Sequence, residues 1–234
     1  MPRRMVFDGW LFFTAGVLLT AGILMVGSAS YYVAMSQDLN PYHYLIRHII
    51  HVLVGVAAFV AMLYVPYTRL ADRRLVTIVV VGALAMLLVV LAMPAAGGAH
   101  RWIPLGPLNL QPSEFAKLAA ILFMASLLSR KEDHVNDPWV VTFPVLATVG
   151  IMAVLIAIEP DLGSAVMLAA TAFLMIFVAG LSWKAIAGAA LLGGFGLVVA
   201  IWAEPFRLDR LRAFLDPGAD PYGTGFQLTQ SLIA

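Results

Sequence analysis

The chain has 234 residues, of which 62% are hydrophobic and 12% are charged, whereas charged residues make up about a quarter of an ordinary soluble domain. This composition excludes a soluble globular protein and indicates an all-α, polytopic membrane protein. The formal net charge of +1 excludes the dense basic face that binds nucleic acid. Because the chain has no cysteine, disulfides and thiol catalysis are excluded, and a bound metal would need oxygen or histidine ligands.

Seven apolar segments approach the roughly 20 residues needed to cross the hydrocarbon core of a membrane. They are expected at residues 9–30, 44–65, 75–93, 113–128, 139–158, 163–180 and 184–203. The first segment is predicted to be a retained helix, because a signal peptide would have a shorter apolar region that ends at a cleavage site. A bundle of about seven transmembrane helices is therefore expected.

The basic residues predict how these helices are oriented, because loops rich in Lys and Arg stay in the cytoplasm. Eight of the 14 basic residues fall on alternate connections, which places that side and the amino terminus in the cytoplasm: Arg3, Arg4, Arg69, Arg73, Arg74, Arg130, Lys131 and Lys184. The other six lie at or near the opposite, outer surface: Arg47, Arg101, Lys117, Arg207, Arg210 and Arg212. Several carboxylates lie on the same side, so the chemistry is expected at the outer leaflet.

One long polar stretch, residues 97–117, interrupts the apolar sequence. It contains His100, Arg101, Trp102, Gln111, Ser113, Glu114 and Lys117. Its glycines and prolines forbid one continuous helix, so a structured or re-entrant loop is expected that leads into a helix near Ser113. Ser113 is predicted to be the N-cap of that helix, with Glu114 in the first turn. Lys117 is either the structural partner of Glu114 in a salt bridge or a functional cation, and the two roles are compatible.

Two further groups of polar residues each have a structural and a functional interpretation. Arg47 shares a helical face with His51, and anion binding by Arg47 is favoured over a metal site because no third ligand is suitably spaced. Glu159 and Asp161 lie in a tight turn, where Asp161 either caps the next helix or joins a charge network or divalent-cation site. The network is the favoured interpretation.

The tail after residue 203 combines basic and acidic side chains. Arg207, Arg210 and Arg212 are followed by Asp216 and Asp220, each of which precedes a proline. Asp-Pro steps are ordinary turn signals. A carboxylate beside several guanidiniums is also suited to deprotonating an alcohol while a phosphorylated leaving group departs.

Three motifs in this order, RWIPLGPLNLQPSEFAKL, EPDLGSA and RLRAFLDPGADPYGTGFQLTQS, resemble those of the FtsW and RodA proteins, the SEDS family of peptidoglycan glycosyltransferases. The MVGSAS and RLDRLRAF segments are more similar to FtsW than to RodA. By this resemblance Asp220 is the catalytic aspartate, with Asp216 as the nearby alternative. The resemblance also implies that Arg101, Trp102, Glu114, Lys117 and Glu159 line the same outer cavity. The full set of substrate-binding candidates adds the other polar residues expected on that side: Arg47, Gln111, Ser113, Asp161, Arg207, Arg210, Arg212 and Gln227.

The resemblance implies an enzyme of the bacterial cytoplasmic (inner) membrane that polymerises lipid II, the undecaprenyl-pyrophosphate-linked disaccharide pentapeptide, on the outer face. A divalent cation, Mg or Mn, is a possible cofactor. The expected partners are a class B penicillin-binding protein, which is a transpeptidase, and other division or elongation proteins. Family members have about ten spans, so residues 1–234 are expected to be a single SEDS-type domain truncated at its C-terminus. The alternatives are a lipid II flippase, which would need polar groups near the bilayer midplane, and a non-catalytic division scaffold.

Overall fold

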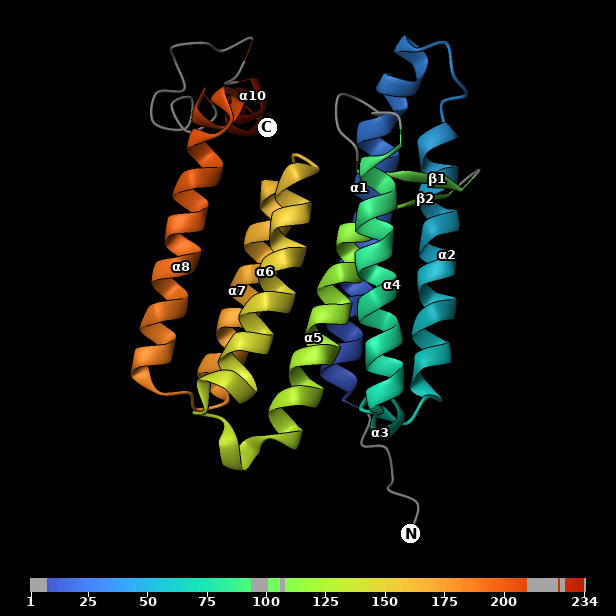
Figure 1. Cartoon of the computed structure of the whole chain (residues 1–234). Coiled ribbons are helices and arrows are strands. Elements are labelled where there is room, and N and C mark those ends of the chain that lie inside the picture. Colours follow the sequence, from blue (N-terminus) through green and yellow to red (C-terminus); the bar gives the residue numbers. More distant parts are fainter. Residues whose placement is uncertain (1–7, 94–100, 106–107, 210–222, 224–225, 234) are drawn as a thin grey trace. The chain divides into compact units, whose positions relative to one another are not determined.

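The computed structural model describes residues 8–93, 101–105, 108–209, 223 and 226–233, and almost all of these residues are helical (Figure 1). The helices are α1 (Gly9–Ser36), α2 (His43–Leu63), α3 (Tyr67–Leu70), α4 (Arg73–Leu91), α5 (Pro112–Arg130), α6 (Phe143–Ile158), α7 (Leu162–Val178), α8 (Trp183–Trp202) and α10 (Phe226–Ile233). A 3-10 turn, η1 (Glu132–His134), and a π-helical turn, η2 (Pro138–Thr142), lead from α5 into α6.

Six of these helices are long and apolar enough to cross a membrane: α1, α2, α4, α5, η2 continued by α6, and α8. Helix α7 is equally apolar but has only 17 residues. The prediction of an all-α protein with about seven apolar helices is confirmed. Helix α1 runs to Ser36, past the predicted end at Ser30, because no glycine or proline occurs between Tyr31 and Ser36 to end it.

The polar stretch is a β-hairpin where the structure describes it. Strand β1 (Ile103–Leu105) pairs with β2 (Leu108–Leu110) in a two-stranded sheet, and α5 follows directly. Helix α5 has Gln111 as its N-cap and Pro112 at its first position, where a fixed φ and a missing N–H suit a helix start. The prediction of Ser113 as N-cap is therefore wrong: the helix begins at Pro112, so its N-cap lies two residues earlier, at Gln111.

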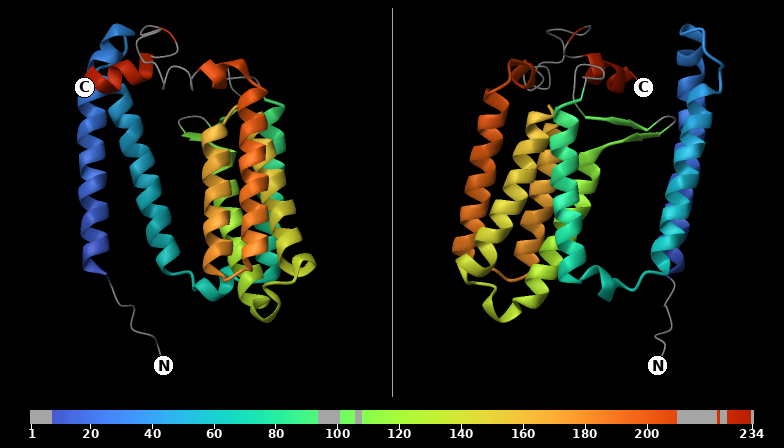
Figure 2. Two further views of the ribbon diagram at one scale, coloured as in Figure 1. Left: turned by 90° about the vertical axis from the view of Figure 1, so that its left-hand side faces the viewer. Right: turned by 45° about the vertical axis from the view of Figure 1, so that its right-hand side comes forward.

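The described residues divide into two compact units. The first is built on α1 and α2, which pack side by side (Figure 2). Most of their residues are exposed, and in these two helices only Ala34 is fully buried. Apolar side chains that face outward all round a helix are suited to a lipid environment.

The second unit is a bundle of α4, α5, α6, α7 and α8 (Figure 1). Buried residues recur every three or four positions along its helices, as expected for one packed face. On α6 and the preceding π-helical turn they are Val141, Val145, Val149, Met152 and Ile156, and on α7 they are Ala165, Leu168, Ala172 and Ile176. Helix α5 contributes Ala116, Ala119 and Ala120, whose small side chains let neighbouring helices approach closely.

Hydrogen bonds between distant segments define the two ends of the second unit. At one end the Ser126 hydroxyl, near the end of α5, donates to the Ala71 carbonyl just before α4 (3.1 Å). At the same end the Ser182 N–H, just before α8, donates to the Asn136 side chain (2.6 Å). The start of α5, the end of α6 and the start of α7 therefore meet at the opposite end, which we call the polar end because it carries the candidate site residues.

Candidate functional site

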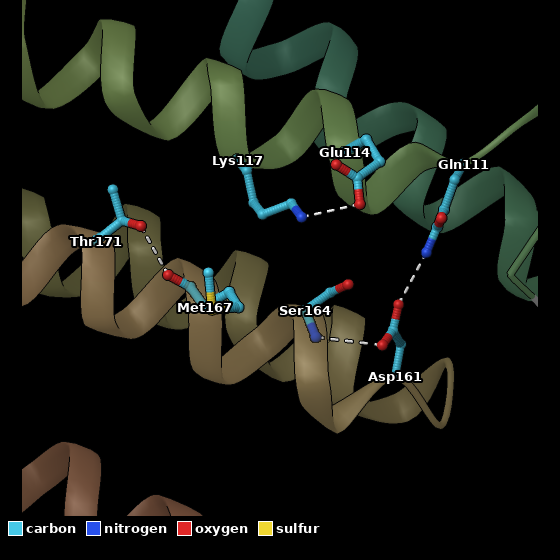
Figure 3. Close-up of polar contacts among 7 residues, drawn as sticks. All are labelled: Gln111, Glu114, Lys117, Asp161, Ser164, Met167 and Thr171. Carbon is cyan, nitrogen blue, oxygen red and sulfur yellow. Dashed lines mark hydrogen bonds and ion pairs between the residues drawn. The ribbon is translucent and has the colours of Figure 1, made fainter. Parts of the chain in front are cut away.

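The first turns of α5 carry an ion pair at the polar end. The Lys117 ammonium lies 2.8 Å from the Glu114 carboxylate, and the lysine side chain is 25% exposed against 55% for the glutamate (Figure 3). Glu114 is also in the first turn of the helix, where the helix dipole favours a negative charge. The predicted salt bridge is confirmed, and among the described residues it pairs a half-buried cation with one exposed carboxylate.

A second contact joins α5 to α7. The Gln111 amide, at the start of α5, donates to Asp161 Oδ2 (2.9 Å). Asp161 Oδ1 accepts from the Ser164 N–H (3.2 Å), which makes Asp161 the N-cap of α7. Figure 3 shows Gln111 reaching across toward Asp161, beside the Glu114 and Lys117 pair. Asp161 therefore both caps α7 and ties it to α5, so the capping interpretation of this residue is confirmed.

Two arginines of the predicted outer surface donate to main-chain carbonyls at the polar end. Arg101 donates from Nε to the Glu159 carbonyl (3.2 Å) and from Nη2 to the Pro160 carbonyl. Arg207 donates to the Ala157 carbonyl (2.8 Å) and the Ala200 carbonyl (2.7 Å). The expected charge network around the Glu159 turn is thus built on main-chain oxygens, because the guanidiniums contact carbonyl groups.

Glu159 is fully buried at the C-terminal end of α6. Neither carboxylate oxygen has a hydrogen-bond partner among the residues that the structure describes. Burial, together with the nearby Asp161 charge, raises the pKa of Glu159 from 4.5 to about 7, and the Arg101 guanidinium opposes part of this rise. Glu159 is therefore about half protonated near pH 7. In its protonated form it can donate a hydrogen bond, which an ionised carboxylate cannot.

Ser113 and Trp102 are the remaining described candidates at the polar end. Ser113 is fully buried in the first turn of α5, and its hydroxyl has no partner within the described part of the chain. Trp102 follows Arg101 and leads into β1, with 42% of its side chain exposed. A half-exposed indole beside a polar cluster offers both an apolar surface and an N–H donor.

The candidate metal ligands do not assemble in the described ranges. No group of three or more His, Asp or Glu side chains there could hold a metal ion. Asp161 already accepts two N–H donors, and the His51 ring bonds to the Arg47 carbonyl of its own helix. These residues do not fit a divalent cation, and no chemical step is assigned to one.

Several predicted site residues lie elsewhere or outside the described ranges. Arg47 is half-buried on α2, in the first unit, and Gln227 lies on α10. Arg210, Arg212, Asp216 and Asp220 lie outside the described residues. The structure therefore brings together Arg101, Gln111, Glu114, Lys117, Glu159, Asp161 and Arg207.

The sequence did not reveal the partners of this cluster. Gln111 and Asp161 were each candidates, but their spacing of 50 residues gives no sign that they pair. The carbonyl groups that receive Arg101 and Arg207 have no sequence signal at all, because every residue has a carbonyl. The burial of Glu159 could have been suspected from its place directly after an apolar helix.

Curated relatives match almost the whole chain. Two of them are called "probable peptidoglycan glycosyltransferase FtsW". The protein from Idiomarina loihiensis is 38% identical, and the match covers 98% of this chain and 56% of the relative. The protein from Aeromonas salmonicida is 35% identical, and the match covers 98% of this chain and 58% of the relative. The Allochromatium vinosum protein of the same name is 40% identical, over 93% and 55%. The chain thus spans a little over half the length of these relatives.

Solved structures and a family model agree with this match. The crystal structure of Thermus thermophilus rod shape determining protein RodA is similar with a TM-score of 0.61 and 28% identity, over 85% of this chain and 60% of that one. A chain of a peptidoglycan synthase complex is similar with a TM-score of 0.74 and 27% identity, over 99% of this chain and 66% of that one. The FtsW/RodA/SpoVE family model, described as "cell cycle protein", matches residues 9–234. The chain therefore belongs to the FtsW/RodA/SpoVE family.

Proposed function

We propose that the full-length protein is a peptidoglycan glycosyltransferase that polymerises lipid II at the outer face of the bacterial cytoplasmic membrane. The observation that carries this proposal is the family match over residues 9–234, with relatives that are called probable peptidoglycan glycosyltransferase FtsW. The polar end of the second unit supports it, because carboxylates and cations gather there. A sugar substrate with a pyrophosphate leaving group needs both kinds of group.

Asp220 is proposed as the general base. It would take the proton from the C4 hydroxyl of the acceptor N-acetylglucosamine as that oxygen attacks the anomeric carbon of the N-acetylmuramic acid on the growing chain. The bond from that carbon to the pyrophosphate oxygen breaks, and undecaprenyl pyrophosphate departs with the electron pair. A single displacement of this kind inverts the anomeric centre. Asp216 is the alternative base, and its position before Pro217 also suits a simple turn residue.

Cations would balance the charge of the departing pyrophosphate. Lys117 is the best placed of the described candidates, because its side chain is half-buried and its ammonium is paired with the more exposed Glu114. A phosphate oxygen could share the Lys117 ammonium with that carboxylate. Arg47, Arg210 and Arg212 are further candidates, since guanidiniums bind phosphate in a bidentate manner.

The proposed orientation places the polar end outside the cell. It rests on the basic residues of the opposite end, such as Arg73, Arg130 and Lys184, which favour the cytoplasm. A class B penicillin-binding protein is proposed as partner. The likeness to a chain of a complex described as coordinating polymerization and crosslinking supports this pairing. A role in cell division is proposed from the FtsW relatives.

The test uses purified full-length protein in lipid vesicles that contain lipid II. The proposal predicts glycan strands resolved on a gel, together with release of undecaprenyl pyrophosphate. Transfer of lipid II between the two leaflets without polymer would instead identify a flippase. Binding of the partner transpeptidase with neither polymer nor transfer would identify a scaffold, and either result would refute the proposal.

A further inference from the structure

Arg207 occupies a junction in the second unit. It lies in a short helical turn after α8, just before the segment 210–222 that contains Asp216 and Asp220. Its side chain is half-buried. The Nη1 group donates to the Ala200 carbonyl at 2.7 Å, and the Nη2 group donates to the Ala157 carbonyl at 2.8 Å. One guanidinium therefore binds two helices and the start of the following segment together.

Both acceptors lie in the last turn of a helix, Ala157 in α6 and Ala200 in α8. The last four carbonyls of a helix have no partner within it, and cations are favoured there by the helix dipole. Two charged donors at ordinary hydrogen-bond distances satisfy these groups well. The two N–H groups are thereby engaged and do not point to a ligand.

Arg101 makes a similar contact from a different segment, with the turn that follows α6. Its donors reach the carbonyls of Glu159 and Pro160, which directly follow α6. The end of α6 and the turn that follows it are thus held by two arginines, Arg207 and Arg101, that are distant from them and from each other in sequence. This turn bears the buried Glu159 carboxyl and the Asp161 cap.

We propose that Arg207 is a positioning residue that anchors the helical turn of residues 205–209 to α6 and α8, and that it does not bind the substrate phosphate. This inference rests on the proposed function for its catalytic consequence, because Asp220 follows this turn in the sequence. Displacing a reacting group by about 1 Å can cost on the order of a hundredfold in rate. An anchor of this kind would therefore control the rate of the chemical step and leave substrate affinity unchanged.

The test compares Arg207→Gln and Arg207→Lys in the full-length protein with Arg130→Gln as the matched control. Arg130 also donates to a carbonyl, that of Ser126, but at the opposite end of the second unit. Arg207→Gln is expected to lower kcat on the order of a hundredfold with little change in KM for lipid II. Arg207→Lys should rescue it poorly, because one ammonium does not reproduce the planar fork of donors. A raised KM that lysine restores would overturn the proposal, since it would identify a phosphate ligand.

Amide hydrogen exchange of residues 203–209 gives a second measurement that needs no activity. Arg207→Gln should speed exchange there, and Arg130→Gln should not. Unchanged exchange in Arg207→Gln refutes the anchor. If the wild-type protein makes no polymer while exchange still rises only in Arg207→Gln, the anchor is supported and the proposed function fails.

Discussion

Replacing Glu159 by glutamine should stabilise the protein at high pH, because glutamine cannot ionise in the buried site. The pKa of Glu159 rises from 4.5 to about 7 on folding, so the folded protein binds this proton more tightly than the unfolded chain does. The free energy of unfolding therefore falls as the pH rises from about 4.5 to about 7. Above that range the full cost of the ionised, buried carboxyl is present.

The two pKa values give the size of the effect. A difference of 7 − 4.5, or about 2.5 units, corresponds to about 3.5 kcal/mol at about 1.4 kcal/mol per unit. Glu159→Gln is expected to raise the free energy of unfolding by about 3 kcal/mol at pH 8, and by less than about 1 kcal/mol at pH 5. Because the carboxyl is fully buried, solvent screening reduces this figure little.

The assay is unfolding in detergent micelles at pH 5 and pH 8, followed by tryptophan fluorescence. Glu114→Gln is the matched control, because Glu114 is more than half exposed and paired with Lys117. This control should lose at most about 1 kcal/mol, which is the opposite sign. If Glu159→Gln differs from the wild-type protein by the same amount at both pH values, Glu159 is not a buried, unpaired carboxyl in the folded state.

Three further predictions address the polar end and its orientation. Lys117→Met should abolish polymerisation of lipid II while the folded yield in detergent stays near the wild-type value; equal losses of both would favour a purely structural lysine. Gln111→Leu should lower the free energy of unfolding by about 1.5–3 kcal/mol, because the Asp161 carboxylate loses a donor; an unchanged melting temperature would show that this contact is not formed. An impermeant maleimide should label Trp102→Cys but not Lys131→Cys in intact cells, since the chain has no native cysteine, and the reverse pattern would invert the proposed orientation.

The apolar helices could be predicted well from sequence because membrane spans are defined by length and composition. The seven expected segments correspond to α1, α2, α4, α5, α6, α7 and α8. The predicted ends of these helices were less accurate where the sequence gives only a weak signal for a helix end. Helix α1 continues to Ser36 because hydrophobicity falls there without a helix-breaking residue, and α5 begins at Pro112, before the expected Ser113, because proline suits the first helical position.

The candidate site was predicted in its residues but not in its contacts. Glu114 and Lys117 could be paired from their spacing on one helix. Arg101 and Arg207 were expected to face phosphate, yet in the structure they donate to carbonyls. A carbonyl group is present at every position, so only the folded backbone determines which one an arginine meets. The raised pKa of Glu159 likewise depends on the burial of its carboxyl group in the fold, and the spacing of residues in the sequence does not reveal that burial.

The account depends most on Asp220 as the general base of lipid II polymerisation. A positioned base contributes about a hundred- to ten-thousand-fold to rate, so Asp220→Asn in the full-length protein should lower polymerisation by that order while lipid II binding persists. Asp216→Asn should have a much smaller effect, because an Asp-Pro step is an ordinary turn signal and asparagine favours a turn as well as aspartate does. Rates of glycan strand formation by the two variants, measured beside their affinities for lipid II, test the claim directly. Normal polymerisation by Asp220→Asn, whether or not Asp216→Asn is active, would contradict it.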